Sequence, residues 1–113
     1  MVNNPRYPHD IIVRRIQSDE SGVPITDDNG DIVYSTILTS TCGLRTMTDP
    51  DVNSGISQTD IKVSIPTPLI DVLVKIKDLV VFKNNIDGEV LNGEVSSYRV
   101  NNFGYNIFFH ING

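Results

Sequence analysis

The sequence predicts an all-β fold: a small antiparallel β-barrel of about six strands, with long loops and an extended N-terminal arm. Val and Ile dominate the apolar residues, and these β-branched side chains favour a pleated sheet. Short stretches of alternating apolar and polar residues are separated by turn residues, as in antiparallel sheets. Closing such a sheet removes its exposed edges. A chain of 113 residues supports one core, so residues 1–113 are expected to form one domain.

The chain begins with an arm, residues 1–9, which carries two prolines and is expected to be extended. Residues 10–17, DIIVRRIQ, alternate as a strand does, with one aliphatic pair on each face. A polar stretch follows and includes the dipeptide Asn29-Gly30, which favours a hairpin because both residues tolerate positive φ.

The second predicted strand covers residues 31–47 and is expected to bend or bulge near Gly43. Residues 48–57, TDPDVNSGIS, contain Asp, Pro, Asn, Ser and Gly with few hydrophobic residues, and are therefore predicted to be a long mobile loop. QTDIKVSIP then shows the clearest alternation in the chain. It predicts a strand in which Ile61, Val63 and Ile65 point inward while Asp60, Lys62 and Ser64 point outward.

Residues 69–77 are ambiguous, because their aliphatic spacing fits a helical face while the β-branched residues and nearby prolines favour a turn. A strand is predicted from about Asp78 to Lys83. The remaining chain predicts a turn at 84–88, a long strand at 89–100 with Gly93 as a bulge or close-packing point, a turn at 101–104 and a final strand at 105–112.

The final strand presents one core face and one mixed face. Its core face is formed by Tyr105, Ile107, Phe109 and Ile111. Phe108 lies on the other face, between Asn106 and His110. An aromatic side chain on a polar face is expected to be shielded from water by a neighbouring segment. This segment is either part of the same chain, such as the arm near Tyr7, or part of another chain.

The charge balance and the single cysteine exclude several classes of protein. The formal net charge is −5 and there is no block of basic residues, so tight binding to nucleic-acid phosphates is not expected. An acidic surface repels DNA phosphates and is therefore compatible with a protein along which DNA moves without binding. Cys42 cannot form an intramolecular disulfide, and no signal peptide or membrane-spanning segment is predicted.

Few residues suggest chemistry. Cys42, His9 and His110 have no local signature of a nucleophile with its base, and we expect a buried cysteine and two surface histidines. The acidic turn residues lack the ligand spacing of a calcium loop and are expected to be solvated; they are Asp19, Glu20, Asp27, Asp28 and Asp31. We therefore expect no catalytic residue, no cofactor, no metal and no enzyme activity.

Several segments together resemble the head-closure, or stopper, proteins of tailed bacteriophages, a family of head–tail connectors. The segments are YPHDIIVRRI, DNGDIVY, TSTCGLRTM, QTDIKVSIP and the closing pair IKDLVVFKN…GEVLNGEVSSYRVNNFGYNIFFHI. Asp78 before an aliphatic strand and Gly93 in the next strand also match the family pattern. TPLIDVL departs from the pattern, since it is more apolar than the usual linker.

The resemblance implies a ring of identical subunits in the virion neck, below the portal, assembled in the host cytoplasm. Such a ring extends the DNA channel without binding DNA specifically, helps to retain the packaged genome, and docks tail proteins. Its channel loop would be residues 48–57, with Asp49, Asp51, Asn53 and Gly55. In a ring, Phe108 and Phe103 are candidate interface residues, and Phe108→Ser is then expected to weaken oligomerisation but leave the monomer folded.

Two other functions remain open. A barrel of oligonucleotide-binding type would stack bases on aromatic residues, and the candidates are Phe82, Tyr98, Phe103, Tyr105 and Phe108. Such a barrel also needs a basic groove for the phosphate backbone, and the sequence does not predict one because its lysines and arginines are scattered. A cysteine hydrolase would require an exposed Cys42 thiol with a lowered pKa.

Overall fold

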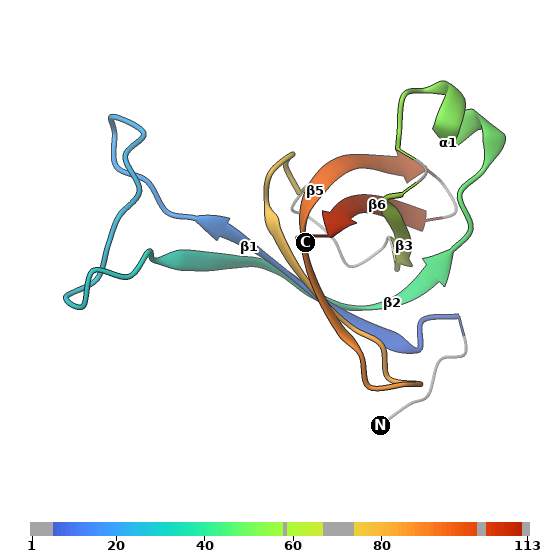
Figure 1. Cartoon of the computed structure of the whole chain (residues 1–113), viewed down its shortest axis with the longest axis horizontal. Helices are drawn as coiled ribbons and strands as arrows, with labels where there is room; N and C mark the ends of the chain where they lie inside the picture. Colours follow the sequence, from blue (N-terminus) through green and yellow to red (C-terminus); the bar gives the residue numbers. More distant parts are fainter. Residues whose placement is uncertain (1–5, 58, 67–73, 102–103, 112–113) are drawn as a thin grey trace.

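Six antiparallel strands form a closed ring in the computed structural model, which describes residues 6–57, 59–66, 74–101 and 104–111. The strands pair in the order β1-β2-β3-β6-β5-β4, and β4 pairs with β1 to complete the ring (Figure 1). Their bounds are β1 His9–Ile16, β2 Tyr34–Arg45, β3 Ile61–Ile65, β4 Leu79–Lys83, β5 Val90–Asn101 and β6 Gly104–Ile111. The predicted all-β class and strand count are confirmed. The ambiguous segment 69–77 lies largely outside the described residues.

The core fills the ring with inward side chains from every strand. Ile11 and Val13 of β1 are fully buried, whereas Ile12 and Ile16 on the opposite face are not. β6 follows its predicted pattern, with a buried core face and a partly buried Ile111. The central cluster contains Ile11, Val13, Cys42, Val63, Ile65, Val74, Val80, Phe82, Val95, Tyr105, Ile107 and Phe109.

Two register shifts interrupt the ladders. The first leaves Ile37 of β2 without an opposite residue, because Val13 faces Leu38 and Arg14 faces Thr36. Of the predicted bend or bulge near Gly43, the bulge is wrong in position; at Gly43, β2 passes from pairing with β1 to pairing with β3. The second shift leaves Ser96 of β5 unpaired between Val95 and Ser97, and such a bulge turns its side chain away from the regular alternation.

Gly93 is a close-packing point, as predicted. A Cβ atom at this position would overlap the carbonyl oxygen of His110 and press on the Phe109 ring. The glycine therefore lets β5 and β6 approach each other beside the core.

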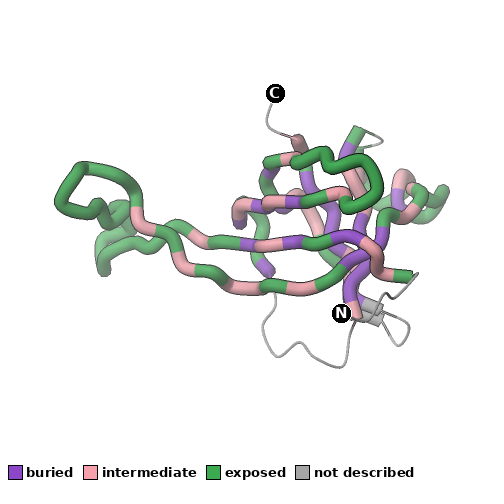
Figure 2. The backbone as a smooth tube through the Cα atoms, turned by 90° about the horizontal axis from the view of Figure 1, so that it is seen from below, coloured by how far each residue is buried: buried purple, intermediate pink, exposed green. Residues whose placement is uncertain are grey.

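Between β1 and β2 the chain leaves the ring altogether. Residues 17–33 project to one side as a long extension, and Figure 2 shows them almost uniformly exposed. The Cα radius of gyration is 14.9 Å, whereas a compact chain of this length has about 13 Å. The molecule is thus a small barrel from which the extension, residues 17–33, protrudes.

Candidate functional site

The predicted loop at residues 48–57 contains a short helix, α1, Asp49–Asn53. Its N-terminus is closed by a capping box: the Thr48 hydroxyl accepts a hydrogen bond from the Asp51 amide, and an Asp51 carboxylate oxygen accepts one from the Thr48 amide. Pro50 in the first turn fits this start. The sequence analysis did not anticipate this helix, and the T-D-P-D motif carried the signal.

Asp51 attaches α1 to the barrel. Its carboxylate is buried and receives Lys62 Nζ of β3 at 2.7 Å and Arg99 Nη1 of β5 at 3.2 Å. Arg99 also donates to the Ser54 hydroxyl. Burial raises the pKa of Asp51, but hydrogen bonds from Lys62 and Thr48 outweigh that effect, so its pKa falls to about 2. This carboxylate is permanently ionised near neutral pH and its charge is compensated locally.

The four predicted channel residues therefore separate into two groups. Asp49, Asn53 and Gly55 are exposed on α1 and just after it. Gly55 has φ +95, a backbone conformation that suits glycine. Asp51 fastens the segment instead of presenting a free charge. Whether this segment faces a channel stays a prediction.

Of the two covers considered for Phe108, its own chain or another chain, the structure shows the first, and the expectation of a ring exposed on the monomer is wrong. Its side chain is 0% exposed, yet it is absent from the central cluster because it lies on the outer face of β6. The Lys62 ammonium lies 5.6 Å from the centre of its ring. Lys62 faces Phe108 across the β3–β6 ladder and forms an ion pair with Asp51, so α1 is attached beside this outer face.

The structure bears on only one of the other two aromatic residues considered at this face. Phe103 lies outside the described residues. Tyr7, considered as a cover for Phe108, instead lies near the guanidinium groups of Arg6 and Arg45, at 5.9 and 5.7 Å from the ring centre. The mixed face of the last strand is therefore covered at Phe108 within the same chain.

A Ser–Asp–His group that sequence reasoning missed lies next to Phe108, whose carbonyl oxygen also accepts a hydrogen bond from the Ser96 hydroxyl. The Ser96 hydroxyl donates to Asp60 Oδ2 at 2.5 Å, and His110 Nδ1 lies 3.1 Å from Asp60 Oδ1. Asp60 is thus central, whereas a catalytic triad requires the serine to contact the histidine. Asp60 and Ser64 were predicted to point outward, but both are buried. These hydrogen bonds hold Ser96 in place at the β5 bulge and do not activate the Ser96 hydroxyl as a nucleophile.

Cys42 is buried as predicted, and its environment opposes thiolate chemistry. Burial, reinforced by the nearby Asp10 carboxylate and opposed by Arg45, raises the pKa of this thiol to about 12. His110 is exposed at the surface, but the expectation of a surface His9 is wrong. His9 is buried edge-on against Phe82, and its Nδ1 accepts the Asn85 amide at 3.1 Å.

The extension, residues 17–33, is built from two similar loops. In the first, Asp19 Oδ1 accepts hydrogen bonds from the amides of Ser21 and Val23, and Gly22 has φ +82. In the second, Asp27 Oδ1 accepts from the amides of Asn29 and Asp31, and Gly30 has φ +84. The predicted Asn29-Gly30 turn is part of this second loop. The shared D-x-S/N-G pattern, eight residues apart, was the available signal.

The extension concentrates the charge of the protein. The chain has 14 acidic and 9 basic residues, and residues 17–33 contain five acidic residues and no Lys or Arg. The rest of the chain therefore has nine of each, and the whole net charge of −5 belongs to the extension. The same segment exposes Val23, Ile25 and Ile32, while Ile16 and Tyr34 are exposed at its base. Carboxylates and aliphatic side chains thus share one solvated surface.

The aromatic residues proposed to stack bases are mostly inaccessible. Phe82, Tyr105 and Phe108 are buried, and the Tyr105 hydroxyl accepts the Val74 amide at 2.8 Å. Tyr98 is partly exposed and packs near Tyr105. A stacking platform requires exposed ring faces, so this set does not supply one.

The chain matches no family model, no curated protein and no solved structure. Within the described part of the chain, no group of three or more His, Cys, Asp or Glu side chains is placed to hold a metal ion. Among the same residues, no helix combines the length and apolar character needed to cross a membrane.

Proposed function

We propose that this protein is a structural subunit of a bacteriophage neck, a head–tail connector or head-closure protein that acts by assembly. Identical subunits form a ring below the portal, extend the DNA channel, help to retain the genome and present a docking surface to the tail. The observation that carries this proposal is the extension: 17 residues of ordered, exposed chain that the barrel does not use for its core. A surface of this kind serves contact with another molecule.

The pattern resemblance to head-closure proteins supplies the biological setting, and the charge distribution is compatible with it. Acidic groups repel DNA phosphates, so a channel lined by them lets DNA pass without specific binding. Asp49 beside the exposed end of α1 is the candidate for such a lining charge. Asp51 would act indirectly, by holding α1 on the barrel through Lys62 and Arg99.

The proposal is tested with purified capsid–portal particles. They are mixed with the protein and imaged by electron microscopy, and the expected result is an added ring of density below the portal. Particles treated with Asp51→Ala protein, in which α1 loses its anchor, are expected to show a ring with weaker density at the α1 segment. Particles that acquire no ring with wild-type protein would contradict the proposal.

A single-strand-binding module is the second candidate, and the buried aromatic residues weigh against it. Its test is a gel shift with single-stranded DNA at low salt. A salt-sensitive complex would favour this function over assembly, because phosphate contacts weaken as salt rises.

A further inference from the structure

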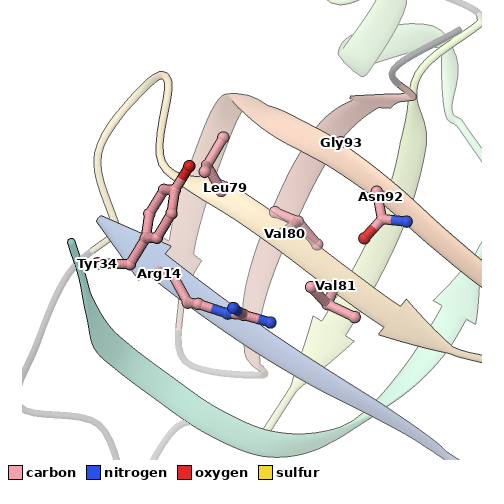
Figure 3. Close-up of a pocket in the computed structure, with 7 residues that line it drawn as sticks. All are labelled: Arg14, Tyr34, Leu79, Val80, Val81, Asn92 and Gly93. Carbon is pink, nitrogen blue, oxygen red and sulfur yellow. The ribbon is translucent and has the colours of Figure 1, made fainter. Parts of the chain in front are cut away.

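A shallow groove crosses the outer face of the barrel on the side formed by β1, β4 and β5, with β2 at one edge. One part, of about 270 Å³, is lined by Arg14, Tyr34, Leu79, Val81 and Asn92 (Figure 3). The adjoining part, of about 320 Å³, is lined by Ile12, Val81, Lys83 and Val90 together with Asp10 and Thr39. Val81 belongs to both parts, and the strand register places Ile12 opposite Val81 and Arg14 opposite Leu79. The two hollows therefore form one continuous surface, named here the outer groove.

The outer groove is apolar at its floor and basic at two points. Ile12, Leu79 and Val81 remain only partly buried on this outward face. Arg14 and Lys83 are exposed, and neither has a side-chain partner among the described residues. Two acidic residues lie nearby: Asp10, one of whose carboxylate oxygens already accepts a hydrogen bond from Asn85, and Glu94, which is opposite Leu79 on β5. The groove thus offers aliphatic contact and two free cations.

The extension has the complementary character. It carries Val23, Ile25 and Ile32 in exposed positions and five carboxylates without any cation. The Glu20, Asp28 and Asp31 carboxylates have no hydrogen-bond partner among the described residues. The extension cannot reach the outer groove of its own chain, because it continues outward from β1 and β2, which form the groove's edge (Figure 1).

We infer that the extension of one subunit docks in the outer groove of a second copy of this chain. The two surfaces are different patches of the same molecule, so the contact is heterologous, and such contacts propagate into closed rings when the rotation closes. The inference rests on the proposed ring and adds which surfaces join its subunits. Charge complementarity sets the direction of docking, with extension carboxylates next to Arg14 and Lys83.

The test uses two charge-reversed proteins that are expected to fail alone and succeed together. The groove variant is Arg14→Glu with Lys83→Glu, and the extension variant is Glu20→Lys, Asp28→Lys and Asp31→Lys. Each variant alone places like charges at the reversed positions, so self-association measured by sedimentation velocity should fall at least about 100-fold. Wild-type protein is measured in parallel, alone and on capsid–portal particles as a template.

An equimolar mixture restores opposite charges at every contact, since each extension then meets a groove of the other variant. The mixture should therefore assemble to within about threefold of the wild type, and this recovery also demonstrates that both variants are folded. A third protein that combines all five reversals should likewise assemble alone.

Variants that each associate as wild type does, or a mixture that stays unassembled, would overturn the docking inference while the ring itself stands. Wild-type protein that forms no oligomer, either alone or on the template, would overturn both the ring and the docking contact. If the groove variant still assembles with its neighbours through another surface, the ring proposal stands and only the docking of the extension in the outer groove is overturned.

Discussion

The barrel and the extension use similar aliphatic residues for opposite purposes. In the barrel, Ile11, Val63 and Ile107 are fully buried among strands that enclose them. In the extension, Val23, Ile25 and Ile32 stay in solvent, and order comes from backbone hydrogen bonds and the carboxylates of Asp19 and Asp27. The stability of the protein therefore resides in the barrel, and the extension is free to be shaped for contact with a partner.

The barrel and the extension should differ most in the free energy of unfolding that is lost when an apolar side chain is replaced by a smaller one. Phe109→Ala removes a fully buried ring that packs against Phe82 and Gly93, and should lower the free energy of unfolding by about 3–5 kcal/mol. Ile25→Ser in the extension should change it by no more than about 0.5 kcal/mol. Urea denaturation of both variants makes the comparison, and equal losses would show that the extension shares the core.

Phe108, on the outward face of β6, should stabilise the barrel as a core residue does. Because Phe108 is fully buried under Lys62, Phe108→Ser should destabilise the monomer by roughly 3 kcal/mol or more, rather than weaken oligomerisation alone. Thermal unfolding followed by circular dichroism checks this. A variant with an unchanged melting temperature and lost self-association would restore the interface role first expected from the sequence.

The ion pairs of Asp51 should contribute a smaller, pH-dependent stabilisation. Asp51→Asn removes charge-assisted bonds to Lys62 and Arg99 and should lower stability by about 1–3 kcal/mol near neutral pH. The folded-state pKa of about 2 lies below the unfolded value of about 3.9, so this contribution is present above about pH 5 and is lost as pH falls toward 2.

The exposed Asp49 provides the matched control. Asp49→Asn should change the free energy of unfolding by less than about 0.5 kcal/mol. Urea unfolding at several pH values gives the curves for both variants. A difference between Asp51→Asn and the wild type that stays constant from pH 7 to pH 2 would contradict the assigned ion pairs.

Replacement of a glycine by alanine should give the smallest difference in stability loss between the barrel and the extension. Gly93→Ala introduces a methyl group against the His110 carbonyl and the Phe109 ring, with an expected loss of about 1–3 kcal/mol. At Gly22 of the extension a methyl group meets open space, but φ is +82, so Gly22→Ala should lose about 1 kcal/mol through backbone strain alone. Chemical denaturation distinguishes them, and a tolerated Gly93→Ala would refute the close approach of β5 and β6.

Much of the barrel could be predicted from the sequence because strand alternation is a local signal. The period of two in IKVSI and in GYNIFFHI identified Val63 and Ile107 as core residues directly. The same signal could not reveal that Phe108, on an outward face, is buried, because its contact with Lys62, itself held by Asp51, joins residues far apart in the chain. The burial of Asp60 likewise depends on Ser96 and His110, which are far away in the chain.

The surfaces proposed for docking were predictable only in part. The acidic turn residues of the extension were visible in the sequence, and Asn29-Gly30 indicated its second turn. The outer groove was not visible, because it combines Arg14, Val81 and Asn92 from three strands through the pairing register. Register is set by the whole sheet rather than by any one segment.

Replacement of the extension measures its role most directly. Gln17 and Val33 are already joined by a backbone hydrogen bond, so residues 18–32 can be replaced by Asn-Gly to form a direct two-residue hairpin. The account predicts a monomeric protein whose free energy of unfolding lies within about 1 kcal/mol of the wild type and that adds no ring to capsid–portal particles. A shortened chain that fails to fold, or one that still assembles as the wild type does, would contradict it.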